Sequence, residues 1–210
     1  SDEGVDALAI LDRIEADDGT ILYQRQLNRK RVVDDKSSLA IGNILENVVK
    51  FGTGRGGGQK VRLGGAGDDN SELGKLNLPV PFLGKTGTAN NYTNASFLGY
   101  LPGVAENGVA MTTAGGYAIG VYVGFENNLP MQVRGSRISG AEGALPAWSS
   151  IANTILDVKG YRNMLDPVDL SFYGLGIKWS NLGQLNVGVD PDQGGKTFEP
   201  FKWVSELDRF

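Results

Sequence analysis

Two stretches of the chain carry hydrophobic residues at helical spacing. In residues 34–50 the apolar positions fall at i, i+3, i+4, i+7 and i+8, namely Ile41, Ile44, Leu45, Val48 and Val49. In residues 146–158 the same spacing is repeated by Trp148, Ile151, Ala152, Ile155 and Leu156. This spacing predicts two amphipathic helices, each with one continuous apolar face. Asp34 and Asp35 are candidate N-caps of the first helix, and we expect the second to lie on a sheet.

Apolar runs of strand length predict a sheet between these two helices. Residues 80–89, 96–101 and 117–125 are the candidate strands, and the third alternates clearly between two faces. One of its faces holds mostly small residues, against which a helix can pack closely. We therefore expect an α+β fold in which an antiparallel sheet of these three strands is covered by helices.

The two ends of the chain give weaker patterns. Asp17-Asp18-Gly19 separates the runs 7–16 and 20–26, and an Asp-Gly turn between alternating apolar runs predicts a β-hairpin. Near the other end, residues 170–179 and 184–189 are candidate short strands. We divide the chain into residues 1–160 and a C-terminal appendage, 161–210, to which the sequence assigns no role.

Composition narrows the possible chemistry. The chain has 210 residues, 40% of them hydrophobic and 21% charged, which is typical of a globular protein. Its net charge of −4 argues against nucleic acid as a partner. No apolar run approaches the roughly 20 residues of a membrane-spanning helix. Because the sequence contains neither Cys nor His, disulfides, thiolate nucleophiles and a Ser-His-Asp triad are excluded. Any acyl-transfer chemistry must then use lysine, and we expect no metal or cofactor.

The strongest chemical signal is Lys85-Thr86-Gly87-Thr88, which directly follows an apolar run. A lysine at the end of a strand can hold a negative charge, and two threonine hydroxyls can bind a carboxylate. Two other interpretations compete: a strand that ends in a polar turn, and a phosphate-binding loop. The loop would need a glycine where Pro79 stands. Gly52 to Gly57 matches a dinucleotide fingerprint by letter but follows a helix, so we set nucleotide binding aside.

The surrounding motifs give the tetrapeptide its context. Gly99-Tyr100-Leu101-Pro102 ends the next strand, residues 121–125 read VYVGF, and Gly-Ala-x-Pro-x-Trp at 143–148 opens the last helix. In this order and spacing, residues 8–158 resemble the transpeptidase domain of class A penicillin-binding proteins. Asn94 and Ser96 depart from the family pattern, where an aspartate and a tryptophan are usual.

The resemblance implies a function. Members of this family are bifunctional cell-wall synthases on the outer (periplasmic) face of the bacterial cytoplasmic membrane, with a glycosyltransferase domain and a membrane anchor upstream. Their transpeptidase is acylated by the D-Ala-D-Ala end of a peptidoglycan stem peptide or by a β-lactam. The resemblance also implies that Lys85 supplies charge and proton transfer, and that Thr86 and Thr88 hold the substrate carboxylate beside Gly87. The backbone N–H of Thr88 would be one oxyanion donor.

Two of the family's three motifs have no counterpart here. No serine has a lysine three residues later, and no serine is followed two residues on by asparagine. We therefore expect the chain to be the C-terminal portion of the domain, whose N-terminal part would supply the nucleophile. The alternatives are a non-catalytic module that binds peptide carboxylates and an inert structural fragment.

Overall fold

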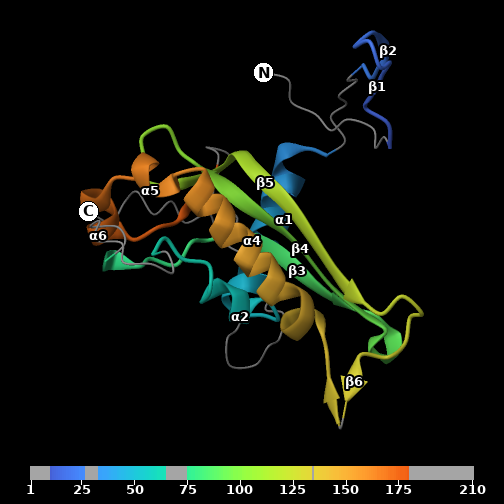
Figure 1. Ribbon diagram of the computed structural model, residues 1–210. Helices are drawn as coiled ribbons and strands as arrows, with labels where there is room; N and C mark the ends of the chain where they lie inside the picture. The colour runs from blue at the N-terminus through green and yellow to red at the C-terminus, as the bar shows by residue number, and fades with distance from the viewer. Residues whose placement is uncertain (1–9, 27–32, 65–74, 134, 180–210) are drawn as a thin grey trace. The chain divides into compact units, whose positions relative to one another are not determined.

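The computed structural model describes residues 10–26, 33–64, 75–133 and 135–179 (Figure 1). The chain divides between Ser38 and Leu39 into two compact units. The candidate strand 184–189 lies outside the described residues. No described helix is long and apolar enough to cross a membrane.

The first unit contains the predicted hairpin. Strands β1 (Arg13–Glu15) and β2 (Ile21–Gln24) pair antiparallel, which confirms the prediction. Gly19 takes a φ of 84°, a left-handed conformation that glycine adopts without strain. The Thr20 backbone N–H donates to Asp18 Oδ1 at 2.9 Å, and this hydrogen bond holds the pKa of Asp18 below its usual value.

The second unit is built on a four-stranded sheet of order β3-β4-β5-β8. Strands β3 (Leu83–Thr88), β4 (Asn94–Val104) and β5 (Met111–Gly124) pair antiparallel, as the sequence predicts, although β5 begins at Met111 and not at residue 117. Strand β8 (Ile177–Lys178) is parallel to the start of β5. The fold is therefore α+β with a mostly antiparallel sheet. The short elements around it are α2 (Arg55–Gly58), η1 (Asn90–Tyr92), β6 (Gln132–Val133), β7 (Ser136–Arg137) and η2 (Gly140–Ala144).

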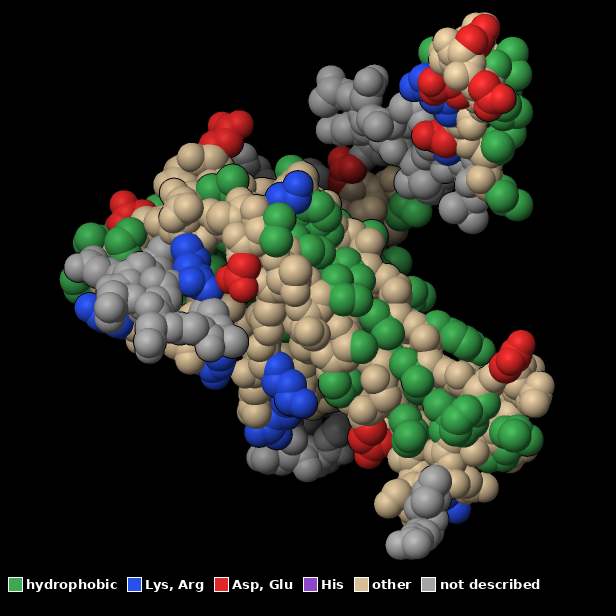
Figure 2. Space-filling model, in the orientation of Figure 1, with side chains coloured by type: hydrophobic (Ala, Val, Ile, Leu, Met, Phe, Trp, Pro, Cys, Tyr) green, Lys and Arg blue, Asp and Glu red, His purple; other side chains and the backbone are tan. Residues whose placement is uncertain are grey.

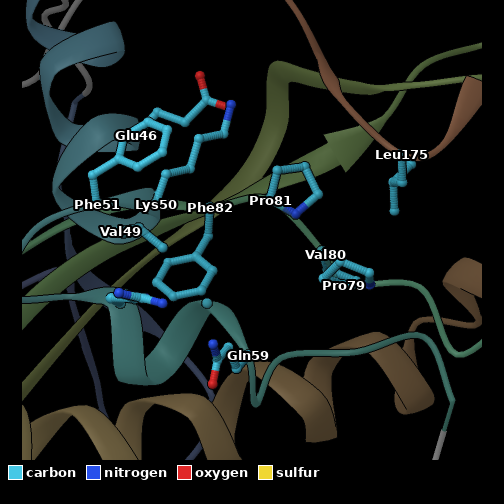
Figure 3. Close-up of a pocket in the computed structure, with 12 residues that line it drawn as sticks. Glu46, Val49, Lys50, Phe51, Gln59, Pro79, Val80, Pro81, Phe82 and Leu175 are labelled. Carbon is cyan, nitrogen blue, oxygen red and sulfur yellow. The ribbon is translucent and has the colours of Figure 1, made fainter. Parts of the chain in front are cut away.

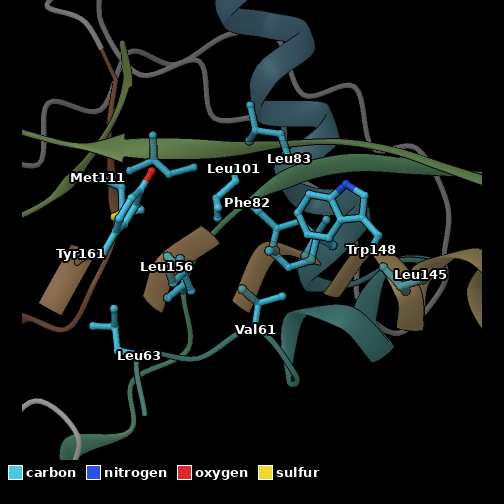
Figure 4. Close-up of a cluster of buried hydrophobic side chains, with 14 of the residues drawn as sticks. Val61, Leu63, Phe82, Leu83, Leu101, Met111, Leu145, Trp148, Leu156 and Tyr161 are labelled. Atoms are coloured by element: carbon cyan, nitrogen blue, oxygen red, sulfur yellow. The ribbon is translucent and has the colours of Figure 1, made fainter. Parts of the chain in front are cut away.

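Helix α4 (Leu145–Val158) covers one face of this sheet. Trp148 is fully buried, packs tilted against Phe82 and edge-to-face with Phe97, and donates its Nε1–H to Ile119 O at 3.1 Å. Figure 4 shows this cluster of buried side chains on the α4 side of the strands. The helix thus packs on the bulky face of β5, which carries Ile119, and not on its face of small residues.

The packing of α4 on the bulky face of β5 corrects an expectation from the sequence, which favoured the face of small residues. On the other face of the sheet, Leu98 is 67% exposed and Tyr122 is 66% exposed. The bulky face is preferred because it buries more apolar surface per residue, and burial is worth roughly 25 cal/mol per Å². Figure 2 shows hydrophobic side chains gathered along the course that β5 follows in Figure 1.

Helix α1 (Asp35–Lys50) begins and ends as predicted, but its buried face overlaps the predicted apolar face only in part, at Val49 and the partly buried Leu45. Asp34 accepts from the Ser37 backbone N–H at 3.0 Å, so it is the N-cap, and this bond holds its pKa below the usual value. Ile41 and Ile44, predicted to be in the apolar face, are about half exposed. The buried positions are Leu39, Gly42, Glu46 and Val49.

The start of the C-terminal region joins the core of the second unit. Tyr161 and Leu170 are buried, and the Tyr161 hydroxyl donates to Pro102 O at 3.1 Å. Burial raises the pKa of Tyr161 to about 12. Residues 170–179 were predicted as a strand, which is wrong for its first part: α6 (Pro167–Tyr173) follows α5 (Tyr161–Met164), and only β8 is extended. The Asp166 side chain caps α6 by accepting from the Val168 and Asp169 backbone N–H groups.

The outer edge of β5 is largely unpaired within the described residues. Strand β8 pairs only with Met111 and Thr112, and no described strand pairs with residues 113–124 on that side. A long free edge presents a row of unused backbone donors and acceptors.

Candidate functional site

Strand β3 is an edge strand of the sheet, and it carries the Lys-Thr-Gly-Thr sequence. Among the described strands it pairs with β4 alone, in a register that sets Lys85 opposite Leu98 and Thr88 opposite Ala95. Antiparallel pairing on one side leaves alternate backbone groups of β3 directed away from the sheet. An extended peptide can add to such an edge through main-chain hydrogen bonds.

The Lys85 side chain is exposed and bends toward the next residue. Its Nζ donates to Thr86 O at 2.8 Å and lies 3.3 Å from Thr86 Oγ1. One ammonium and one hydroxyl therefore lie within hydrogen-bond distance of each other on the exposed part of the strand. Together they offer a positive charge and a neutral donor to an incoming anion.

A residue that the sequence did not single out completes this pair. Thr53 Oγ1 lies 2.6 Å from Thr86 Oγ1, although 33 residues separate them in the chain. The turn after α1 brings Thr53 there, because the Gly52 and Gly54 backbone N–H groups both donate to Val48 O at 3.0 Å. In the sequence Thr53 stands only within Gly52 to Gly57, which was set aside as a dinucleotide fingerprint, and within residues 8–158, which resemble the family.

Thr88 is held by a different segment, the short helix η2. The Gly140 backbone N–H donates to Thr88 Oγ1 at 3.0 Å. A Cβ on Gly140 would lie 2.5 Å from Gly87 O and 2.6 Å from Ser96 O, so only glycine allows this approach. As an acceptor the Thr88 hydroxyl is already engaged, but its own hydrogen can still be donated to a ligand.

The start of η2 is fixed by a capping box. Ser139 and Glu142 exchange side-chain and backbone hydrogen bonds across the first turn. The Ser139 backbone N–H and hydroxyl hold the pKa of Glu142 below its usual value. This box orients the Gly140 N–H that bonds to Thr88.

The predicted site residues therefore lie on one strand, and two distant segments support them. Lys85 and Thr86 are joined to Thr53, while Thr88 and Gly87 lie against Gly140. A Cβ on Gly87 would also collide with Ser96 Oγ on the paired strand. The group can bind an anion and accept a peptide along the strand edge, but it contains no activated nucleophile.

The described residues contain no group of three metal-ligating side chains. Comparison of the sequence with models of known protein families gives no match, and comparison with curated proteins gives none either. A family assignment thus depends on the motifs and their arrangement.

Proposed function

We propose that this chain is the C-terminal portion of the transpeptidase domain of a class A penicillin-binding protein. The observation that supports it is an arrangement of four motifs. Lys-Thr-Gly-Thr lies on the edge strand β3, Gly-Tyr-x-Pro on β4, VYVGF at and just after the end of β5, and Gly-Ala-x-Pro-x-Trp across the end of η2 and the start of α4. Consecutive motifs occupy elements that pack on one another.

The proposed reaction is peptidoglycan cross-linking by acyl transfer. A serine oxygen attacks the carbonyl of the penultimate D-Ala, the peptide C–N bond breaks, and the terminal D-Ala leaves with the serine proton. An amine of a neighbouring stem peptide then attacks the ester, which forms a new amide and returns the proton to the serine. A β-lactam would acylate the same serine when its ring opens.

In this proposal each site residue has a task that suits its position. The stem peptide adds to the free edge of β3, and its terminal carboxylate is bound by the hydroxyls of Thr86 and Thr88. Lys85 stabilises that charge and takes part in proton transfer. The Thr88 backbone N–H is one oxyanion donor, and Gly87 keeps the strand close to Ser96.

The proposal requires a second part of the same domain. That part would contribute the Ser-x-x-Lys nucleophile, the Ser-x-Asn pair and the other oxyanion donor. It also implies a location on the outer face of the bacterial cytoplasmic membrane and a glycosyltransferase domain in the parent protein. The partners would be the stem peptide, β-lactams and this missing part.

The test is covalent labelling with a fluorescent penicillin, followed by denaturation. The full-length parent should be labelled, and Lys85→Ala should slow labelling by roughly two orders of magnitude or more, as for other transition-state electrostatic groups. Lys60→Ala, an exposed lysine outside β3, is the matched control and should leave the rate unchanged. A parent that is never labelled would refute the proposal.

Residues 1–210 alone should carry no label, because the site lacks an attacking serine. If they bind D-Ala-D-Ala peptides without acylation and the parent is also not labelled, a non-catalytic carboxylate-binding module replaces the proposal. The free edge of β3 is the observation that keeps this second function open. Stoichiometric labelling of the isolated chain would mean that one of its own serines is the nucleophile.

A further inference from the structure

A cavity of about 340 Å³ lies beside the candidate site and is lined by residues that the proposed reaction does not use. It lies between the end of α1, helix α2 and the segment 79–82 that leads into β3 (Figure 3). Val49, Val80 and Phe82 form buried walls, with exposed fractions of 4%, 1% and 0%. Its volume is within the range of small-molecule sites, roughly 300–1,000 Å³.

The charges around this cavity are not balanced. Glu46 is buried and is paired with Lys50, with an Oε1–Nζ distance of 2.7 Å. Arg55 also lines the cavity, and no described carboxylate forms a salt bridge with its guanidinium. Among the described residues of the lining, one carboxylate and two cations leave one net positive charge. The rest of the lining is apolar apart from Gln59, so the positive charge faces a mainly hydrophobic space.

We infer that this cavity binds an organic anion with an apolar body, such as a medium-chain carboxylate. The apolar part would lie against Val80, Phe82 and Pro81, where it displaces water from hydrophobic walls. The anionic group would bind at Arg55, whose planar guanidinium suits a carboxylate. A neutral apolar ligand would leave the Arg55 guanidinium without an anionic partner, and a cationic ligand would be repelled by the guanidinium.

A ligand bound in the cavity would also affect the geometry of the candidate site. Phe51 and Arg55 line the cavity, and Thr53, which bonds to Thr86, lies between them in the same turn. The cavity wall formed by Val80 and Phe82 continues directly into β3. A ligand that shifts either segment changes the geometry of the Thr53–Thr86 hydrogen bond. This consequence rests on the proposed function: the cavity is placed to regulate peptide binding at the strand edge.

The test is a titration of the isotopically labelled chain with octanoate, followed by backbone amide chemical shifts. We expect saturable shifts at Gly58 and Val80 in the cavity, and smaller shifts at Thr53 and Thr86. Arg55→Met should weaken binding about fivefold, the size of one solvent-exposed charge pair. Lys60→Met removes a nearby charge that does not line the cavity and should leave the affinity unchanged.

Two further measurements make the inference falsifiable. Gln59→Trp places a large side chain at the exposed margin of the cavity and should abolish binding, while its far-ultraviolet circular dichroism confirms that the fold is retained. Octanol, which has the same apolar body without the charge, should bind more weakly than octanoate. The inference is overturned if Gly58 and Val80 do not shift, if Arg55→Met binds like the unchanged chain, or if octanol binds as tightly. None of these results depends on transpeptidase activity.

Discussion

Helices α1 and α4 carry the same predicted apolar pattern, yet they are buried in different ways. On α4 the pattern and the buried face largely agree, and Trp148 is the centre of an aromatic cluster. On α1 the buried positions share only Val49 with the predicted face, while Ile41 and Ile44 are about half exposed. Periodicity therefore identifies a helix, but the neighbours available in the fold decide which face is covered.

The largest difference should appear when the centre of the α4 face is removed. Trp148→Ala deletes a fully buried ring and the Nε1 hydrogen bond to Ile119 O. We expect the free energy of unfolding to fall by about 3–5 kcal/mol, measured by chemical denaturation. Ile151→Ala, on the same helix but 42% exposed, is the control and should cost about 1 kcal/mol or less. Equal losses at the two positions would mean that the α4 face is wrongly assigned.

On α1 the tightest position is Gly42. A Cβ there would lie 2.6 Å from Cζ3 and 2.7 Å from Cη2 of Trp179. Overpacking of this kind costs about 1–3 kcal/mol, and the higher helix propensity of alanine returns up to about 1 kcal/mol. We expect Gly42→Ala to lower the free energy of unfolding by about 1–2 kcal/mol. In a Trp179→Leu background the same change should no longer destabilise, and a loss that persists there would contradict the packing argument.

We expect the ion pair on α1 to contribute little to the free energy of unfolding, although its carboxylate is buried. Glu46 is paired with Lys50, whose side chain is half exposed, so solvent weakens the attraction. We expect a coupling free energy of about 0.5–1 kcal/mol in a double-mutant cycle with Glu46→Gln and Lys50→Met. A coupling of several kcal/mol would show that α1 depends on a buried ion pair rather than on its apolar contacts.

The smallest effect is expected at Ile41, which the sequence placed in the apolar face. It is 54% exposed, so Ile41→Gln should change the free energy of unfolding by about 0.5 kcal/mol or less. Leu39→Ala, at a buried position of the same helix that the sequence did not place in the apolar face, should cost more than about 1 kcal/mol. If Ile41→Gln is the more damaging of the two, the predicted face is covered in solution and the described one is not.

The sequence predicted much of the framework of this fold. The three antiparallel strands and the bounds of α1 and α4 followed from hydrophobic spacing and caps. The strand predicted in residues 170–179 was wrong for its first part, where α6 lies, although Asp166 followed by Pro167 is a readable helix start. Apolar content alone had favoured a strand there.

The candidate site was predicted only in part. The sequence predicted that one strand carries four of the site residues, because these are consecutive: Lys85, Thr86, Gly87 and Thr88. Thr53 and Gly140 were not, because their positions depend on how distant turns fold back onto β3. No local pattern encodes a hydrogen bond between segments 33 or 52 residues apart.

The parallel pairing of β8 with β5 has a consequence for the order of folding. Val104 and Met111 pair across a short connection, whereas Met111 and Ile177 are 66 residues apart (177 minus 111). Loop-closure entropy favours the local pairing, so we expect the three-stranded meander to form first and β8 to dock late. Pulse-labelled hydrogen exchange during refolding should protect the β4 amides before the Met111 amide, which donates to Gly176 O at 2.9 Å. Until β8 docks, no described strand pairs with the outer edge of β5, so this edge can pair with other chains and slow folding at high concentration should favour aggregation.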